Sequence, residues 1–219
     1  GKFNGIKLFA STGFKFPDKF EEQIEDLIDS SIDYYVEGEK VGIIRYKEDA
    51  HNEYIDFNLS TSDLDLHGMK ICLDCGHGAT SKIAEELFIR TGADVIALNT
   101  DYNGMDINDN CGSTNSDVVA KAVLDNNADA GFSFDGDGDR LIAVDEKGRV
   151  MDGDHYLAAL AKHMKDKKTL KSNGVVGTVM ANLGLRKFLE ENNIDFIAAN
   201  VGDRYVLEEM IKGEYNLGG

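Results

Sequence analysis

The sequence predicts an α/β protein, with tandem α/β domains whose mixed, largely parallel sheets are flanked by helices. Two strand–turn–helix–strand units, at residues 70–98 and 175–199, are the main observation behind this prediction. In each unit, a short run rich in Val, Ile and Ala is followed by a turn and by apolar residues at helical spacing. Short apolar runs bounded by Gly or Asn are typical of strands buried on both faces. Because such units join parallel strands through right-handed crossovers, they predict sheets with much parallel pairing.

The first 63 residues are expected to be the remainder of an N-terminal domain. We expect a strand at Ile6–Ala10, a helix at Pro17–Ile32, a strand around Val41–Tyr46 and a helix at His51–Leu59. Pro17 suits the first turn of a helix, and the apolar residues after it recur at three- and four-residue spacing. These elements are too few for a self-contained sheet. Since the chain also lacks an initiator methionine and stops abruptly, we expect a fragment truncated at both ends.

Polar or charged junctions near residues 60–66 and 166–173 predict two further regions: a second α/β domain at 64–168 and part of a third at 169–219. The expected strands are Lys70–Asp74, Asp94–Leu98, Ala130–Phe134, Leu141–Asp145, Val175–Val179 and Asp195–Ala199. The expected helices are Thr80–Arg90, Ser116–Asn126, Asp154–Met164, Leu183–Glu190 and Asp203–Lys212. In the first of these helices, Ile83 and Leu87 share one face while Glu85 and Glu86 point outward.

Composition and charge exclude several classes of function. The 219 residues are 42% hydrophobic and 29% charged, which is typical of a globular protein. No apolar run approaches the length of about 18 residues that a membrane-spanning helix needs. The formal net charge of −17 repels nucleic acid and anionic lipid, so we exclude both as partners. The 3 cysteines are too few, and odd in number, for a disulfide framework, which indicates a cytoplasmic location.

Three aspartates alternate with glycines directly after the strand expected at Ala130–Phe134, in the run Asp135-Gly136-Asp137-Gly138-Asp139-Arg140. Alternate residues of an extended chain lie about 6.7 Å apart, where two carboxylates repel by roughly 2.5 kcal/mol at an effective dielectric of about 20. Two such pairs approach half of the stability of an ordinary domain, which is about 5–15 kcal/mol. The loop therefore predicts a bound cation, and ligands that are all oxygen favour Mg²⁺ or Ca²⁺.

Three alternatives compete for this loop. In a calcium EF-hand, Asp135, Asp137, Asp139 and Glu146 would have the ligand spacing, but Arg140 stands where the loop needs glycine. In a haloacid-dehalogenase-type phosphatase, Asp135 would be the nucleophile, but Asp139 replaces the expected Thr or Val. A plain Asp-Gly hairpin between two strands would explain the glycines, but not the third aspartate or the arginine.

The aspartate loop resembles the metal-binding loop of the α-D-phosphohexomutase superfamily. Three further segments, Ile107–Thr114, Gly177–Met180 and Val201–Val206, look like the bacterial phosphoglucosamine mutase branch of that superfamily. Asn4–Phe9 resembles the strand that follows the superfamily's phosphoserine loop. The similarity runs through essentially the whole chain, and Val201–Val206 favours the glucosamine branch over phosphomannomutase or phosphoglucomutase.

The resemblance implies an isomerase that converts glucosamine 6-phosphate to glucosamine 1-phosphate for cell-wall precursor synthesis. A phosphoserine would donate its phosphoryl group and recover one from a bisphosphate intermediate. That serine would lie a few residues before Gly1, so this segment alone is expected to bind metal without turnover. A phosphomannomutase or phosphoglucomutase, and a non-catalytic divalent-cation-binding scaffold, are the alternatives. A homodimer is a further possibility.

The resemblance also implies roles for single residues. Asp135, Asp137 and Asp139 would hold one Mg²⁺ per chain. Lys7 occupies the position of the superfamily's general acid/base lysine, which needs a lowered pKa to serve. Arg140 can fork onto phosphate oxygens, neutralise the aspartates, or do both.

Sugar-phosphate binding is expected in the third region. Gly202, Asp203 and Arg204 lie between a strand and a helix, where backbone amides can cradle an anion. Asp203 could equally cap that helix. Thr178 ends the preceding strand and is expected to face the same cleft.

Overall fold

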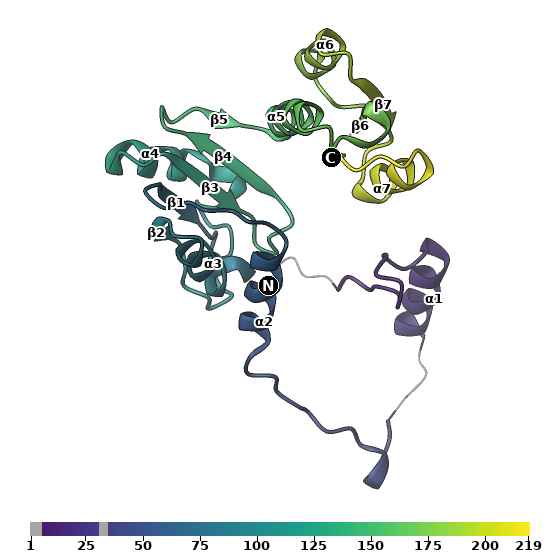
Figure 1. Ribbon diagram of the computed structural model, residues 1–219. Helices are drawn as coiled ribbons and strands as arrows, with labels where there is room; N and C mark the ends of the chain where they lie inside the picture. The colour runs from purple at the N-terminus through teal and green to yellow at the C-terminus, as the bar shows by residue number, and fades with distance from the viewer. Residues whose placement is uncertain (1–5, 31–34) are drawn as a thin grey trace. The chain divides into compact units, whose positions relative to one another are not determined.

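The computed structural model of the chain describes residues 6–30 and 35–219. The chain forms two compact units that divide between Glu48 and Asp49 (Figure 1). The first residues of the Asn4–Phe9 segment and the last residues of the helix expected at Pro17–Ile32 lie outside the described residues.

The N-terminal unit contains the helix α1 (Asp18–Asp29) and a short 3₁₀ turn, η1 (Gly38–Lys40). Within residues 6–30 and 35–48 the two expected strands, Ile6–Ala10 and Val41–Tyr46, do not form, and pairing is limited to an isolated bridge between Phe9 and Lys15. A strand persists only where a neighbouring strand satisfies its backbone groups, and the described part of this unit supplies none. Most of the apolar side chains in these segments are accordingly exposed, Ile43 to 82%.

The second unit is built on a five-stranded mixed sheet. Its strands, in chain order, are β1 (Lys70–Asp74), β2 (Asp94–Leu98), β3 (Ala130–Phe134), β4 (Leu141–Asp145) and β5 (Val150–Met151). They lie in the order β2-β1-β3-β4-β5, where β1 is parallel to both β2 and β3, and the pairs β3–β4 and β4–β5 are antiparallel (Figure 1). Four of these strands have the bounds expected from the sequence, whereas β5 is an addition, since two residues carry too little pattern to predict a strand.

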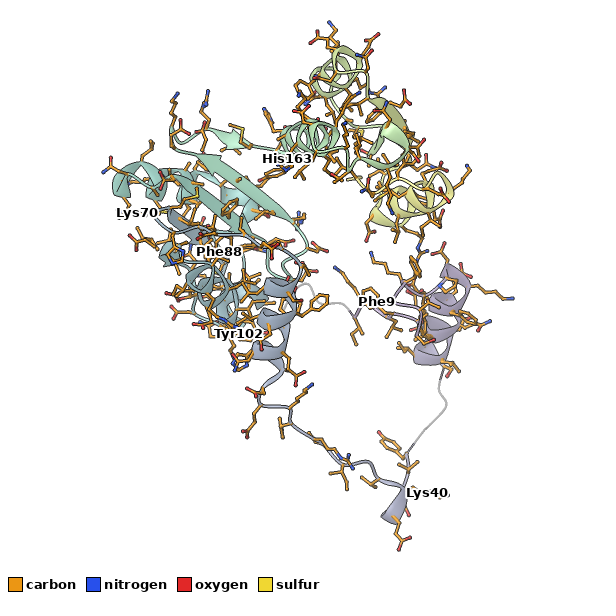
Figure 2. The ribbon with its side chains drawn as sticks, viewed as in Figure 1. Phe9, Lys40, Lys70, Phe88, Tyr102 and His163 are labelled. Atoms are coloured by element: carbon orange, nitrogen blue, oxygen red, sulfur yellow. The ribbon has the colours of Figure 1, made fainter. Side chains whose placement is uncertain are left out.

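Helices cover both faces of this sheet. On one face, α3 (Ala84–Arg90) packs on Ile71, Leu73 and Phe132. This helix carries Phe88 (Figure 2), whose ring centroid lies 5.5 Å from that of Phe132. On the other face, α4 (Asp117–Asn126) packs on Cys72 and Val144. The 3₁₀ turns η2 (Ala79–Lys82) and η3 (Ser113–Asn115) precede these two helices. Because alternate strand residues point to opposite faces, β1 serves both cores at once.

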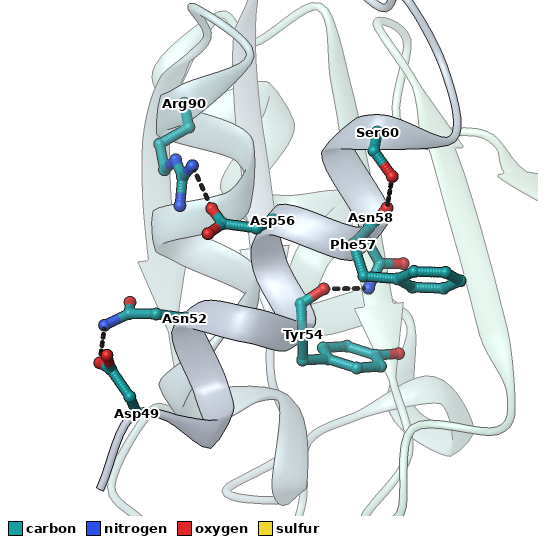
Figure 3. A network of polar contacts seen from close by, with 8 residues as sticks. All are labelled: Asp49, Asn52, Tyr54, Asp56, Phe57, Asn58, Ser60 and Arg90. Carbon is teal, nitrogen blue, oxygen red and sulfur yellow. Dashed lines mark hydrogen bonds and ion pairs between the residues drawn. The ribbon is translucent and has the colours of Figure 1, made fainter.

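The helix α2 (Ala50–Ser60) lies before the domain boundary expected near residue 63 but packs with the second unit. Ile55 is fully buried, and Asp56 accepts a hydrogen bond from Arg90 of α3 at 2.5 Å (Figure 3). Tyr54 and Phe57 of the same helix are exposed. The division into domains at residues 63 and 168 stays a prediction.

The last part of the chain places helices around a two-stranded parallel sheet. In chain order the elements are α5 (Gly153–Asp166), η4 (Lys171–Asn173), β6 (Gly174–Thr178), α6 (Leu183–Glu191), β7 (Asp195–Ala199) and α7 (Asp203–Lys212). Leu157, Val175, Leu185 and Leu189 form the main core between α5, α6 and the sheet. Among the described residues, no helix is both long and apolar enough to traverse a lipid bilayer.

Candidate metal and phosphate site

The parallel strands β1, β2 and β3 end at one edge of the five-stranded sheet. Asp74 at the end of β1 pairs in register with Leu98 of β2 and Ser133 of β3. The chain passes from β1 to β2 on one side and then returns to β3 on the other. In open α/β sheets, ligands bind at the carboxyl ends of strands, where the order reverses in this way. The aspartate loop begins directly after β3, with Asp135, and therefore lies at this position.

The aspartate loop gathers the three predicted carboxylates. One oxygen from each of Asp135, Asp137 and Asp139 lies within 4.8 Å of the others. The backbone turns between Asp135 and Gly138, whose amide donates to the Asp135 carbonyl at 3.1 Å. Gly138 has a φ of +73°, a conformation that residues with a Cβ rarely adopt, so the glycine allows the loop to curl.

Arg140 binds the one aspartate of the three that is buried. The Asp135 side chain is 1% exposed. Its Oδ2 accepts from Nε of Arg140 at 2.7 Å, and its Oδ1 accepts from the Arg140 backbone amide at 3.1 Å. The hydrogen bond from its side chain to Asp135 raises the pKa of Arg140. Because the Arg140 side chain is 65% exposed, its guanidinium is accessible to a ligand as well.

These residues fit a hard divalent cation. The donor set is all oxygen, as Mg²⁺ and Ca²⁺ prefer. Asp137 and Asp139 are exposed, so a bound ion would keep coordination positions open toward solvent or substrate. Mg²⁺ usually retains such positions for water and phosphate, and three carboxylates are a sufficient share from the protein.

Two neighbouring loops pack on the aspartate loop through glycines. A Cβ built on Gly78 would lie 2.4 Å from the carbonyl oxygen of Gly136, and the amide of Ala79 donates to that oxygen at 2.8 Å. A Cβ built on Gly136 would in turn lie 2.4 Å from Ile107 and 3.2 Å from Asn108. Backbones can approach this closely only where the side chain is a hydrogen atom. The glycines therefore fix the loop from both sides.

Asp74 is a residue that the sequence reasoning missed. Its side chain is fully buried and accepts hydrogen bonds from the backbone amides of Gly76 and Gly112, from Asn99 and from Ser133. The sequence does carry one signal, an acidic residue at the end of an otherwise apolar strand. A carboxylate buried there needs hydrogen-bond donors, so its presence indicates that such donors surround it.

The predicted sugar-phosphate residues lie at the carboxyl edge of the second sheet. Thr178 ends β6 and pairs in register with Ala199, which ends β7. Gly202, with a φ of +133°, is the N-cap residue of α7, so Asp203 is the first helical residue rather than the cap. Arg204 follows within the same first turn. The N-terminus of α7 and Thr178 thus lie at one edge, where helix amides favour an anion.

A pocket of about 260 Å³ adjoins this edge. Thr178 lines it together with residues from the start of α5 and with Gly219. The Oγ of Thr178 accepts from the Met180 amide at 3.3 Å, which orients the hydroxyl toward the loop after β6.

Lys7 belongs to the N-terminal unit, where it is exposed. Its grouping with the aspartate loop stays a prediction, as do the individual roles of the other site residues.

Comparison with known proteins identifies two family models along the chain. Residues 46–148 match the phosphoglucomutase/phosphomannomutase α/β/α domain II, and residues 152–219 match the α/β/α domain III of the same family. Together the two matches cover most of the chain.

Curated relatives are named phosphoglucosamine mutase. The chain is 54% identical to that of Finegoldia magna and 50% identical to that of Caldanaerobacter subterraneus, in both cases over 220 aligned residues and 100% of the chain. It spans about half of the length of these relatives, 49% in each case.

Solved structures share the fold. A phosphoglucomutase/phosphomannomutase family protein from Burkholderia thailandensis matches with a TM-score of 0.65 at 23% identity, covering 77% of this chain and 37% of its own. The open form of the phosphoglucomutase parafusin from Paramecium matches with a TM-score of 0.66 at 19% identity, covering 98% of this chain and 44% of its own.

Proposed function

Because the chain belongs to the phosphoglucomutase/phosphomannomutase family, we propose that it is part of an enzyme that interconverts glucosamine 6-phosphate and glucosamine 1-phosphate. The observation that carries this proposal is the aspartate loop with Arg140 at the switch point of the sheet. The names of the relatives at 54% and 50% identity support the choice of sugar.

In this proposal the aspartate loop binds the phosphoryl group while that group moves between the serine and the sugar. Asp135, Asp137 and Asp139 hold one Mg²⁺, which when bound supplies charge stabilisation to the phosphoryl oxygens. Asp135 is held in place by Arg140, so the carboxylate keeps its orientation when substrate is absent. The exposed guanidinium of Arg140 then binds phosphate oxygens beside the loop.

The far end of the substrate is bound at the second sheet. The first turn of α7, with Gly202, Asp203 and Arg204, offers backbone amides and a positive dipole to a sugar phosphate. Thr178 at the same edge contributes a hydroxyl. Two anion-binding positions in one chain suit a bisphosphate intermediate, which carries a phosphate at each end.

Lys7 and a phosphoserine complete the proposed chemistry. Lys7 acts as general acid/base toward the sugar hydroxyl, which requires neighbouring positive charge or burial to lower the pKa of its amine. The proposed phosphoserine would belong to the half of the relatives' length that this chain does not span. The proposal includes a cytoplasmic location, consistent with the three free cysteines, and a homodimer as the assembly to be tested.

A phosphatase is disfavoured by the two family matches, at residues 46–148 and 152–219. In addition, Asp139 stands where a haloacid-dehalogenase-type phosphatase carries Thr or Val. Beryllofluoride trapped on Asp135 would favour the phosphatase instead.

The test is an assay of the intact protein on the 6-phosphates of glucosamine, glucose and mannose, followed by ³¹P NMR. We expect Mg²⁺-dependent formation of the 1-phosphate, with the highest kcat/KM for glucosamine. The variant Asp137→Ala should lose this activity, while Asp63→Ala, which removes the same charge from an exposed position, should keep it. A higher kcat/KM for glucose or mannose would assign the other branch, and no isomerisation of any of the three would refute the proposal.

A further inference from the structure

A fully buried carboxylate, that of Asp74, lies between the strands that carry the candidate site. It ends β1, and its neighbours in the strand, Cys72 and Leu73, belong to the apolar core. Burying a charged group is costly unless every lone pair finds a donor. The cost makes a carboxylate at this position informative, since an apolar residue would continue the strand at no such penalty.

Four hydrogen bonds satisfy this carboxylate, and they come from four segments. Oδ1 accepts from the Gly76 amide at 3.0 Å and from Nδ2 of Asn99 at 2.9 Å. Oδ2 accepts from the Gly112 amide at 2.8 Å and from Oγ of Ser133 at 3.4 Å. Asp74 thus joins the loops that follow β1 and β2, the loop before α4, and the end of β3.

Two of these segments lead directly to the aspartate loop. A Cβ built on Gly112 would lie 2.8 Å from the carbonyl oxygen of Phe134, the residue before Asp135, and 2.7 Å from Oδ1 of Asn108. The Asn108 amide donates to the carbonyl of Gly76 at 2.9 Å, and its side chain lies beside Gly136. The contacts therefore run from the Asp74 oxygens, through Gly76 and Gly112, to the loop that carries the three metal-binding aspartates.

We propose that Asp74 is a positioning residue for the aspartate loop, and that its two oxygens set the loop's affinity for a divalent cation by fixing the amides of Gly76 and Gly112. This inference rests on the proposed function of the loop as a cation site. Asp74 itself touches neither cation nor substrate. Asp74 acts on the loop through the Gly76 and Gly112 segments, in the way that hydrogen-bond partners behind metal ligands orient those ligands.

The substitution Asp74→Asn tests this role with minimal change of shape. An asparagine offers one oxygen and one NH₂ group, so it can accept from the Gly76 amide or from the Gly112 amide but not from both. One backbone N–H is then left facing another donor. The affinity of the intact protein for Mn²⁺, measured by electron paramagnetic resonance, should fall about tenfold or more. In the activity assay the Mg²⁺ concentration for half-maximal rate should rise by the same factor, with KM for the sugar phosphate at saturating Mg²⁺ little changed.

Asp145→Asn is the matched control. Asp145 accepts the backbone amides of Lys147 and Arg149 on Oδ1 and the Arg149 side chain on Oδ2, so its asparagine variant also loses a carboxylate acceptor. Asp145 ends β4 and pairs with Ala130 at the start of β3, away from the aspartate loop. This variant should lower the melting temperature while its Mn²⁺ affinity stays within about twofold of the wild type. If Asp74→Asn behaves in the same way, Asp74 only stabilises the fold and the inference is wrong.

Asn99→Gly provides a second variant in case Asp74→Asn does not fold. It removes one donor to Asp74, and glycine tolerates the φ of +52° at this position. Roughly threefold weaker Mn²⁺ binding is expected from the loss of one of the four hydrogen bonds, and unchanged binding would overturn the inference. A wild-type protein that binds no Mn²⁺ and isomerises no sugar phosphate would instead refute the proposed function, and the inference with it.

Discussion

Replacing Asp137 with alanine should stabilise the metal-free chain and destabilise the chain at saturating Mg²⁺. The ligand oxygens of Asp135, Asp137 and Asp139 lie within 4.8 Å of one another. At that separation a pair of carboxylates repels by about 3.5 kcal/mol at a dielectric of about 20, and by about 0.9 kcal/mol in bulk water. Because Asp137 itself is exposed, solvent screens its pairs with both Asp135 and Asp139, and we use the value near that of water. Alanine at position 137 removes two such repulsive pairs, about 1.7 kcal/mol, and the lost attraction to Arg140 offsets part of this.

The net gain of about 1 kcal/mol corresponds to a melting temperature about 2–4 °C higher in EDTA for a chain of this size. With Mg²⁺ at about 100 times its Kd, the wild type gains about 2.7 kcal/mol from binding, which the variant largely forgoes. The order of the two melting temperatures should therefore reverse between EDTA and Mg²⁺ in differential scanning fluorimetry. Asp63→Ala controls for the general loss of one negative charge. A variant that melts no higher than this control in EDTA, or that keeps the full Mg²⁺ shift, would refute the electrostatic reasoning.

Three further outcomes are expected. Arg140→Ala leaves the buried Asp135 without its side-chain donor, so urea unfolding in EDTA should show a loss of about 1–3 kcal/mol; an unchanged midpoint would contradict this. Gly78→Ala brings a Cβ to within 2.4 Å of a backbone oxygen of the aspartate loop. It should lower the free energy of unfolding by about 1–3 kcal/mol and weaken Mn²⁺ binding. Gly153→Ala, whose Cβ would meet nothing within 4 Å, should change neither quantity. Burial raises the pKa of Cys75 from 9.0 to about 11. The unfolded chain then releases this proton first, so stability should fall from pH 9 to pH 11, and Cys75→Ala should flatten that slope.

The strands of the second unit show which strands the local sequence pattern predicts correctly. β1, β2, β3 and β4 have the bounds that their apolar runs and flanking glycines predict. Each is paired on at least one side by another strand of the same unit, so tertiary structure reinforces the local preference. The segment Val41–Tyr46 has a comparable pattern but no partner among the described residues, and it forms no strand. A strand forms only when a neighbouring strand accepts and donates its backbone hydrogen bonds, and a single run of residues does not specify that neighbour.

The candidate site divides in the same way. The alternation of aspartate and glycine in Asp135–Arg140 concentrates charge within a few positions, so a candidate cation site at this loop could be predicted from residue types alone. The anchoring role of Asp74 was not, because its four donors come from residues up to 59 positions away along the chain. No local pattern indicates which distant amides a buried carboxylate will meet.

The order of residues along this chain was sufficient for the α/β class, the positions of most helices and strands, and the aspartate loop with its arginine. These features depend on neighbours within a few positions, where side-chain spacing and like-charge repulsion act directly. Folding added the strand order that puts β1 between β2 and β3, the close contact of Gly78 with the loop, and the burial of Asp74. These features depend on segments that are distant in the sequence and adjacent in the fold, because close packing and the hydrogen bonds of buried polar groups involve residues from all of these segments.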